Sequence, residues 1–241
     1  MKYIGYSTGA IALGNFAHAL DLLAVYRFAA VELSALRIDE VEPLVRAVPD
    51  LDLHFYKYVS FHAPSAFAEH EEERLISLLI QLPPAWPIVL HPDAIHRVER
   101  WLPLASRLAI ENMDRRKNTG RTASELREFF ALLPGSRMCL DLGHARQVDS
   151  SMVAAYLLLT EYADRIVQLH VSEVDTFNRH EAISRAAELA FLQVQRFIPN
   201  DIAIILESRV TELTIQAEAE KVINMFGSWT PASHPQIAVL G

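Results

Sequence analysis

The sequence predicts a single-domain (β/α)₈ TIM barrel of the α/β class. Eight short apolar runs alternate with eight segments that carry apolar residues at helical spacing. The apolar runs are nearly continuous, which is typical of parallel strands that are covered on both faces. A chain of 241 residues with 51% hydrophobic residues can bury the core of one such barrel, and no break in composition divides it into two domains.

Each predicted strand is followed by a predicted helix. The strands are expected at residues 3–6, 30–33, 58–62, 88–91, 108–111, 138–141, 166–170 and 202–207. The helices are expected at residues 16–23, 41–48, 75–82, 95–102, 122–133, 152–162, 183–197 and 211–225. The predicted barrel therefore covers residues 1–227, and the C-terminal tail 228–241 shows no clear periodicity.

Local signals place several helix ends. Thr122 and Glu125 form a capping-box pattern at the start of one helix. Pro49, Pro83 and Pro134 end three others, because proline cannot continue the hydrogen bonding of a helix. A doubly wound open sheet is the main alternative fold. The first strand-to-helix turn, however, lacks the Gly-x-Gly-x-x-Gly phosphate loop often found in that fold.

Composition limits the class of protein. The single cysteine, Cys139, excludes an internal disulfide and suits a reducing compartment. The N-terminus resembles a first strand rather than a signal peptide, and no apolar run approaches the roughly 18 residues of a membrane span. A cytoplasmic location is therefore expected. The formal charge of −8 disfavours a general affinity for nucleic acid, because phosphates are held mainly by Lys and Arg.

Potential metal ligands end six successive predicted strands, at His62, His91, Glu111, Asp141, His170 and Glu207. The active site of such a barrel lies where its strands end, so these six side chains are expected to meet. Each alone could be a hydrogen-bonded strand end, but several carboxylates buried together need a cation or protons. The mixture of imidazoles and carboxylates suits Zn²⁺ or Mn²⁺ best, with Mg²⁺ or Co²⁺ as alternatives, and disfavours Ca²⁺.

Residues 138–144 supply two candidates in one turn. Asp141 ends a strand, and Gly143 lets the backbone turn sharply enough for His144 to face the same point. The alternative is a capped strand-to-helix turn with His144 on the surface. His144 and His180 are therefore outer candidates. The remaining histidines are expected to be solvated or satisfied in the core: His18, His54, His70, His96 and His234.

The segments around these residues resemble the xylose isomerase-like barrel superfamily, which includes sugar and sugar-phosphate isomerases and epimerases and the endonuclease IV group of apurinic-site nucleases. The resembling segments are residues 60–64, 89–91, 110–112, 139–144, 169–172, 178–180 and 205–207. The resemblance implies that Glu111, Asp141, His170 and Glu207 bind one divalent metal ion. It also implies that Glu111 and Glu207 move protons on opposite faces of a substrate.

The nuclease branch of this superfamily binds more metal ions. The resemblance implies that His62 and His91 would hold one of them, and that His144 would hold another with an Asp-x-His pair. Here the pair reads Asn178-Arg179-His180. Asparagine lacks the negative charge of aspartate, which counts against the third ion.

Several residues near the expected mouth of the barrel are candidates for contact with a substrate or its phosphate. Arg115 and Lys117 lie in the basic loop after the fifth strand, and Arg179 lies after the seventh. These cations either clamp a phosphate or remain solvated. Lys117 occupies a position where related epimerases often carry glutamate, which counts against a free ketohexose. Glu32 is expected at the end of the second strand, in contact with substrate or in a surface ion pair.

The sequence therefore predicts a divalent-metal-dependent isomerase or epimerase of a sugar or sugar phosphate, acting through an enediolate. A multi-zinc phosphodiesterase of the endonuclease IV type is the alternative, and a non-catalytic sugar- or metal-binding barrel is a third hypothesis. One bound ion favours the isomerase, and two or three favour the hydrolase. The expected partner is a small sugar-like molecule rather than nucleic acid or a membrane.

Overall fold

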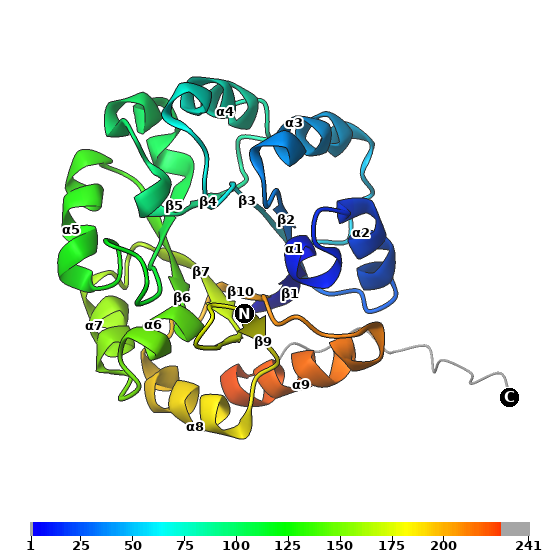
Figure 1. Ribbon diagram of the computed structural model, residues 1–241. Coiled ribbons are helices and arrows are strands. Elements are labelled where there is room, and N and C mark those ends of the chain that lie inside the picture. Colours follow the sequence, from blue (N-terminus) through cyan, green and yellow to red (C-terminus); the bar gives the residue numbers. More distant parts are fainter. Residues whose placement is uncertain (1, 228–241) are drawn as a thin grey trace, which may run out of the picture.

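Eight parallel strands close into a barrel in the computed structural model, which describes residues 2–227 (Figure 1). The strand order is β1-β10-β7-β6-β5-β4-β3-β2. The strands are β1 (Tyr3–Ser7), β2 (Ala30–Ser34), β3 (Tyr58–His62), β4 (Ile88–Leu90), β5 (Leu108–Glu111), β6 (Arg137–Asp141), β7 (Ile166–Val171) and β10 (Ala203–Leu206). The predicted single-domain (β/α)₈ barrel is confirmed, and the predicted tail 228–241 lies outside the described residues.

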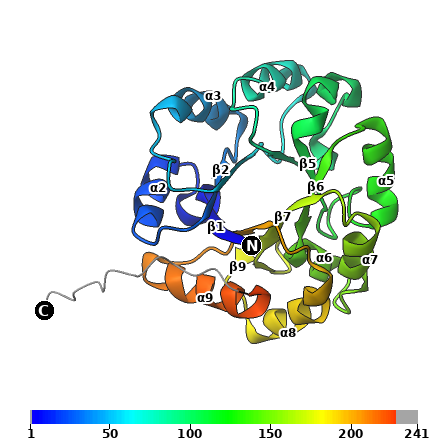
Figure 2. The ribbon, with the colours of Figure 1, turned by 180° about the vertical axis from the view of Figure 1, so that it is seen from behind.

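Helices surround the barrel on all sides, as Figure 2 shows from behind. They are α1 (Thr8–Ala12), α2 (Phe16–Ala24), α3 (Ile38–Ala47), α4 (Glu72–Leu79), α5 (Ala123–Leu132), α6 (Leu142–Val148), α7 (Val153–Glu161), α8 (Arg185–Val194) and α9 (Ile215–Phe226). A small antiparallel hairpin, β8 (Glu173–Val174) and β9 (His180–Glu181), follows β7. Within residues 2–227, no helix is long and apolar enough to cross a lipid bilayer.

Some elements differ from the prediction. The helix expected at residues 95–102 is instead a 3₁₀ helix at Val98–Arg107, which contains Pro103. A proline at that position removes a backbone donor, so a regular α-helix is disfavoured. The helices α1 and α6 and the β8–β9 hairpin were not predicted, because five to seven residues or fewer carry too little periodicity to indicate an element.

Strand geometry places the candidate ligands inside the barrel. Side chains two residues apart on a strand share a face. Val89, Ala109 and Cys139 are fully buried in an apolar cluster separate from the main core between sheet and helices. Because Glu111 and Asp141 stand two residues after Ala109 and Cys139, they point into the same interior, one layer nearer the carboxyl ends of the strands.

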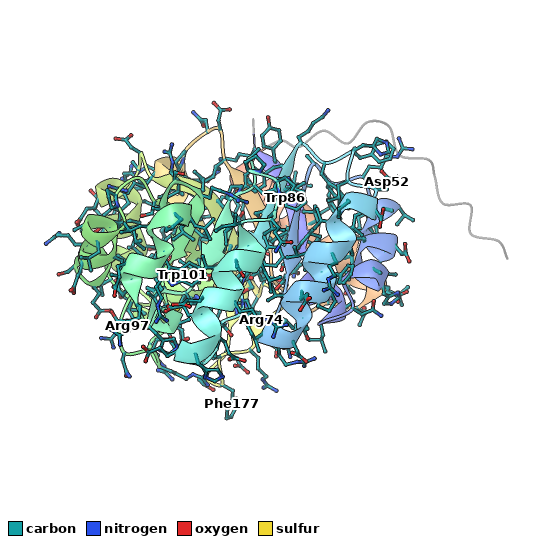
Figure 3. All side chains as sticks on the ribbon, turned by 90° about the horizontal axis from the view of Figure 1, so that it is seen from above. Asp52, Arg74, Trp86, Arg97, Trp101 and Phe177 are labelled. Atoms are coloured by element: carbon teal, nitrogen blue, oxygen red, sulfur yellow. The ribbon has the colours of Figure 1, made fainter. Side chains whose placement is uncertain are left out.

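Figure 3 shows the two ends of the barrel from the side. Trp86, which precedes β4, lies at one end, and Phe177, in the loop between β8 and β9, lies at the other. Phe177 therefore marks the end of the molecule to which the carboxyl ends of the strands point. The cavity lined by the candidate ligands lies at this end.

Candidate metal centre

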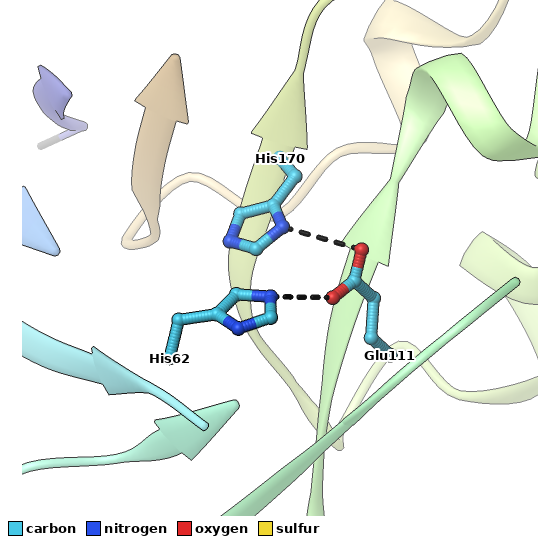
Figure 4. Close-up of side chains that lie close together, drawn as sticks. All are labelled: His62, Glu111 and His170. Carbon is cyan, nitrogen blue, oxygen red and sulfur yellow. Dashed lines mark hydrogen bonds and ion pairs between the residues drawn. The ribbon is translucent and has the colours of Figure 1, made fainter. Parts of the chain in front are cut away.

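Glu111 lies at the middle of the site, between four histidine rings. Its Oε2 is 3.2 Å from the Nε2 atoms of His62 and His91, and its Oε1 is 3.3 Å from the Nδ1 atoms of His144 and His170. Figure 4 shows the two oxygens pointing to different rings, one to His62 and the other to His170. The side chain of Glu111 is only 1% exposed, so solvent does not separate these groups.

The strand-end residues form two overlapping groups whose ligand atoms lie within 4.8 Å of one another. The first consists of His62, Glu111 and His170, and the second of Glu111, Asp141, His170 and Glu207. The second group contains the four residues implied by the family resemblance. His91 follows β4 rather than ending it, and Glu207 follows β10, yet both side chains line the same cavity.

The turn after β6 fixes Asp141 from three directions. Its Oδ1 accepts a hydrogen bond from the backbone N–H of His144, in the first turn of α6, so Asp141 caps this helix. The side-chain amide of Asn112 bonds to both the backbone N–H and the backbone oxygen of Asp141. A Cβ at Gly143 would lie 2.6 Å from the backbone oxygen of Ser172, so only glycine allows this close approach. The capped turn is present, but His144 is buried rather than on the surface.

Hydrogen bonding in the site fits a divalent cation. Asp141 Oδ2, His91 Nδ1 and His170 Nδ1 are buried without a hydrogen-bond partner. His62 Nδ1 lies 2.7 Å from the backbone oxygen of Ala63, so it carries the ring proton. The lone pair of His62 Nε2 then faces an oxygen of Glu111, which is repulsive unless a proton or a cation lies between them.

Burial and neighbouring charges change the pKa values in the site. Burial raises the pKa of Glu207 to about 8. The negative charges of Glu111 and Asp141 also raise this pKa, whereas His170 lowers it. Burial opposes protonation of His62 and His144, but nearby carboxylates outweigh it and raise the pKa values to about 9 and about 10. Without metal, these groups hold protons at neutral pH that a bound cation would displace.

His180 completes the outer part of the site. Its Nδ1 is 2.8 Å from Ser172 Oγ and 3.3 Å from Glu207 Oε2, and its ring lies edge-on to that of His144. Asn178, which replaces the acidic residue of the nuclease pattern, lines the same cavity with a buried Oδ1 that has no hydrogen-bond partner. His144, Asn178 and His180 thus line the same cavity as Glu207.

Glu32 does not end β2 and does not line the cavity. It occupies the middle of the strand and is fully buried. Its Oε2 accepts a hydrogen bond from Gln168 and lies 3.0 Å from His170 Nε2, beneath the layer of candidate ligands. The expected substrate contact or surface ion pair at Glu32 is therefore corrected to a contact inside the barrel.

The cavity above the ligands has a volume of about 300 Å³ and three cations on its wall, Arg116, Lys117 and Arg209. Lys117 pairs with Asp93 at 2.7 Å, and Arg116 donates to the backbone oxygen of Phe177. Within residues 2–227, the side chain of Arg209 has no such partner. Arg116 belongs to the basic loop that the sequence indicates, whereas Arg209 was not predicted, although it follows the strand-end residue Glu207 by two positions.

Two predicted cations lie elsewhere. Arg115 is exposed and does not line the cavity. Arg179 pairs with Asp175 at 2.8 Å and lies over the ring of Phe177, outside the cavity wall. Four of the histidines expected outside the site are exposed, namely His18, His54, His70 and His96. His234 lies outside the described residues.

Comparison with solved structures connects this barrel to enzymes. A xylose isomerase domain protein from Alicyclobacillus acidocaldarius has a TM-score of 0.60 at 12% identity over 94% of this chain and 98% of that one. The 3-keto-D-glucoside 4-epimerase from E. coli gives 0.58 at 14% over 93% and 99%. Endonuclease IV from Thermus thermophilus gives 0.54 at 18% over 93% and 97%.

The similarity is one of fold. No family model matches the chain, and no curated protein matches it. The predicted resemblance to the xylose isomerase-like barrels is confirmed at the level of the fold by these solved structures. Since the matched structures include an epimerase and a nuclease, the fold does not choose between the two reactions.

Proposed function

We propose that the protein is a divalent-metal-dependent phosphoesterase. Its centre would hold at least two ions, one on each side of Glu111. The observation that carries this proposal is that each oxygen of Glu111 faces two imidazoles. A pair of ions that share a carboxylate is typical of phosphate-ester hydrolases. His62, His91 and Glu111 would hold one ion, and the second group would hold the other: Glu111, Asp141, His170 and Glu207.

Ions bound there would act as Lewis acids on a phosphoryl group and neutralise its charge. Side chains of the protein would hold these ions and move the proton. Asp141 is fully buried and does not line the cavity, so its role is to hold an ion, whereas Glu111 lines the cavity and faces both ion positions. Glu207 is 13% exposed and lines the cavity, so it can hold or release a proton beside the substrate.

The cavity wall favours a small anionic substrate. A volume of about 300 Å³ lies at the small end of the range for ligand pockets. Arg209 has no partner among residues 2–227, so its guanidinium is available to a phosphate, whereas Lys117 must first leave Asp93. The charge of −8 disfavours long-range attraction of nucleic acid.

A sugar isomerase or epimerase is the second candidate. The observation that favours it is that Glu111 and Glu207 both lie close to His170 Nδ1, at 3.3 and 3.4 Å. Two carboxylates around one ion position can exchange protons with a substrate carbon. This reaction needs only one ion, held by the second group, and the solved structures of similar fold include an epimerase and a xylose isomerase domain protein.

Metal stoichiometry and the variant His91→Ala separate the two candidates. We expect wild-type protein loaded with Zn²⁺ or Mn²⁺ to retain two or more ions per chain by mass spectrometry and to hydrolyse a chromogenic phosphodiester or phosphomonoester. His91→Ala is expected to lose one ion and the hydrolysis together. One ion in both proteins, with solvent deuterium entering a sugar or sugar phosphate, would replace the phosphoesterase with the isomerase.

A control variant shows that metal loss is local. His96→Ala removes an exposed histidine that contacts the backbone oxygen of Phe67 outside the cavity. It should retain the wild-type number of ions. Wild-type protein that binds no divalent ion would contradict both enzymatic candidates.

A further inference from the structure

Glu32 and His170 form a buried contact that crosses the interior of the barrel. Glu32 lies on β2 and His170 on β7, and both are fully buried. Glu32 Oε2 is 3.0 Å from His170 Nε2, and the opposite ring nitrogen, Nδ1, faces Glu111 and Glu207. The ring therefore connects a carboxylate beneath the metal centre with two carboxylates inside it.

The neighbours of Glu32 fix the direction of its hydrogen bonds. Tyr58 OH lies 2.9 Å from Gln168 Oε1, so the amide nitrogen of Gln168 points to Glu32 Oε2 at 2.6 Å. Ser60 Oγ lies 3.3 Å from the same oxygen. A carboxylate only accepts hydrogen bonds, so these groups present donors to Glu32.

His170 Nε2 lies near both Gln168 and Glu32, so the neutral ring has two possible tautomers. Its amide nitrogen lies 2.7 Å from His170 Nε2. If Gln168 donates to Nε2, the ring proton is on Nδ1, which cannot then bind a metal ion. If Nε2 carries the proton and donates it to Glu32, the lone pair of Nδ1 points into the metal centre.

We propose that Glu32 is a positioning residue for the metal centre: it accepts the Nε2 proton of His170 and thereby keeps Nδ1 free as a ligand atom. The inference rests on the metal centre of the proposed function but not on the reaction. A carboxylate behind a metal-binding imidazole sets its tautomer and raises its basicity. Glu32 acts in this way without touching the substrate, since it does not line the cavity.

The test measures metal affinity and the tautomer directly. Glu32→Met removes the acceptor, and we expect affinity for Zn²⁺, measured by competition with a chromogenic chelator, to fall about 10- to 100-fold. Glu32→Gln keeps an oxygen that can accept, so its loss should be smaller. In Zn²⁺-loaded wild type labelled with ¹⁵N-histidine, long-range correlation spectra should show His170 protonated on Nε2, with His170→Asn used to assign the ring.

A matched control separates positioning from general damage. Glu72→Met alters a buried glutamate on α4, outside the barrel, and should lower stability without changing Zn²⁺ affinity. Wild-type affinity in folded Glu32→Met, or a proton on Nδ1 of His170 in the loaded wild type, would overturn the proposal. If Glu32→Met does not fold, the Zn²⁺ affinity of Glu32→Gln and the His170 tautomer in the wild-type spectrum test the proposal. Tight binding without hydrolysis would contradict the phosphoesterase alone.

Discussion

Two regions of the molecule bury carboxylates, and they do so in opposite ways. On the outside of the barrel, Glu72 accepts hydrogen bonds from the Trp101 indole, the Arg100 guanidinium and two backbone N–H groups. Glu218 on α9 similarly accepts from the backbone N–H of Ile183 and from Lys221. These donors keep their protons throughout the ordinary pH range, so both carboxylates are satisfied by the protein itself.

Inside the mouth, the carboxylates face imidazoles instead. Glu111 has four histidines around it, and Asp141 Oδ2 has no hydrogen-bond partner. An imidazole can give its proton away and offer a lone pair, which an indole or a backbone amide cannot. The difference indicates that the outer carboxylates stabilise the fold, whereas the inner ones are arranged for a cation.

The largest expected effect comes from Glu111→Gln. Replacing one oxygen with an amide nitrogen removes the negative charge that both groups share and one of the two ligand oxygens. We expect metal affinity to fall by more than the roughly 100-fold seen for residues behind a ligand, and activity to be lost. Metal content after dialysis and hydrolysis of a chromogenic phosphoester measure this. Retention of both would place the metal elsewhere.

Glu72→Ala should have a large effect on stability alone. It leaves the Trp101 N–H and two backbone N–H groups unpaired beneath α4. A buried donor left unpaired costs about 1–3 kcal/mol, and the two backbone donors are only partly buried, so the free energy of unfolding by urea should fall by about 1–3 kcal/mol. Metal content should stay at the wild-type value; a loss of metal would show that the two regions are not independent.

Glu72 and Glu207 should also respond to pH in opposite directions. Burial opposes ionisation of Glu72, but the hydrogen bonds to its carboxylate prevail and lower its pKa. The stability that Glu72 contributes is therefore lost only as the pH falls below the usual pKa of a glutamate. The pKa of Glu207 is raised from 4.5 to about 8, so between these pH values the metal-free native state binds one proton more than the unfolded state. Stability should therefore fall as pH rises towards 8, by up to about 1.4 kcal/mol per pH unit for one proton.

Urea unfolding in the presence of a chelator checks this dependence. Glu207→Gln should become more stable than wild type as the pH is raised from 5 to 8, because the amide does not ionise. Glu72→Gln should instead be less stable than wild type throughout this range. Parallel curves for wild type and Glu207→Gln would mean that Glu207 does not bind the extra proton.

The smallest expected effect concerns the cavity wall. Arg209→Ala should raise KM for a phosphorylated substrate about 10-fold, as expected for the loss of one charge-assisted hydrogen bond. The number of bound ions should not change. Arg115→Ala is the matched control, since Arg115 lies outside the cavity. Equal KM values in the two variants would exclude a role for Arg209 in substrate binding.

The sequence predicts the barrel and the convergence of its strand ends because both depend on local patterns. Buried parallel strands are apolar along their length, and their carboxyl ends meet at one mouth whatever the loops do. Glu111 and Asp141 could therefore be placed together from their positions alone. Helix boundaries and the short β8–β9 hairpin could not, because a few residues do not establish a period.

The finer parts of the site depend on contacts between distant strands. Glu32 and His170 are 138 residues apart, and the sequence does not indicate that β2 and β7 place them in contact across the interior. Likewise, nothing local distinguishes Lys117, which is paired with Asp93, from Arg209, whose side chain has no partner in the described part of the chain. Side-chain partners of this kind are determined by the tertiary structure rather than by residue type.

The shared position of Glu111 has a thermodynamic consequence. One carboxylate cannot serve two ion positions independently, because the first ion neutralises the charge that attracts the second and also fixes the orientation of the oxygens. Under the two-ion proposal, occupancy of the two positions is therefore linked, and the coupling is reciprocal: each ion alters the affinity of the other by the same factor. A calorimetric titration with one divalent metal should deviate from independent, identical sites, and Glu111→Gln should remove that deviation.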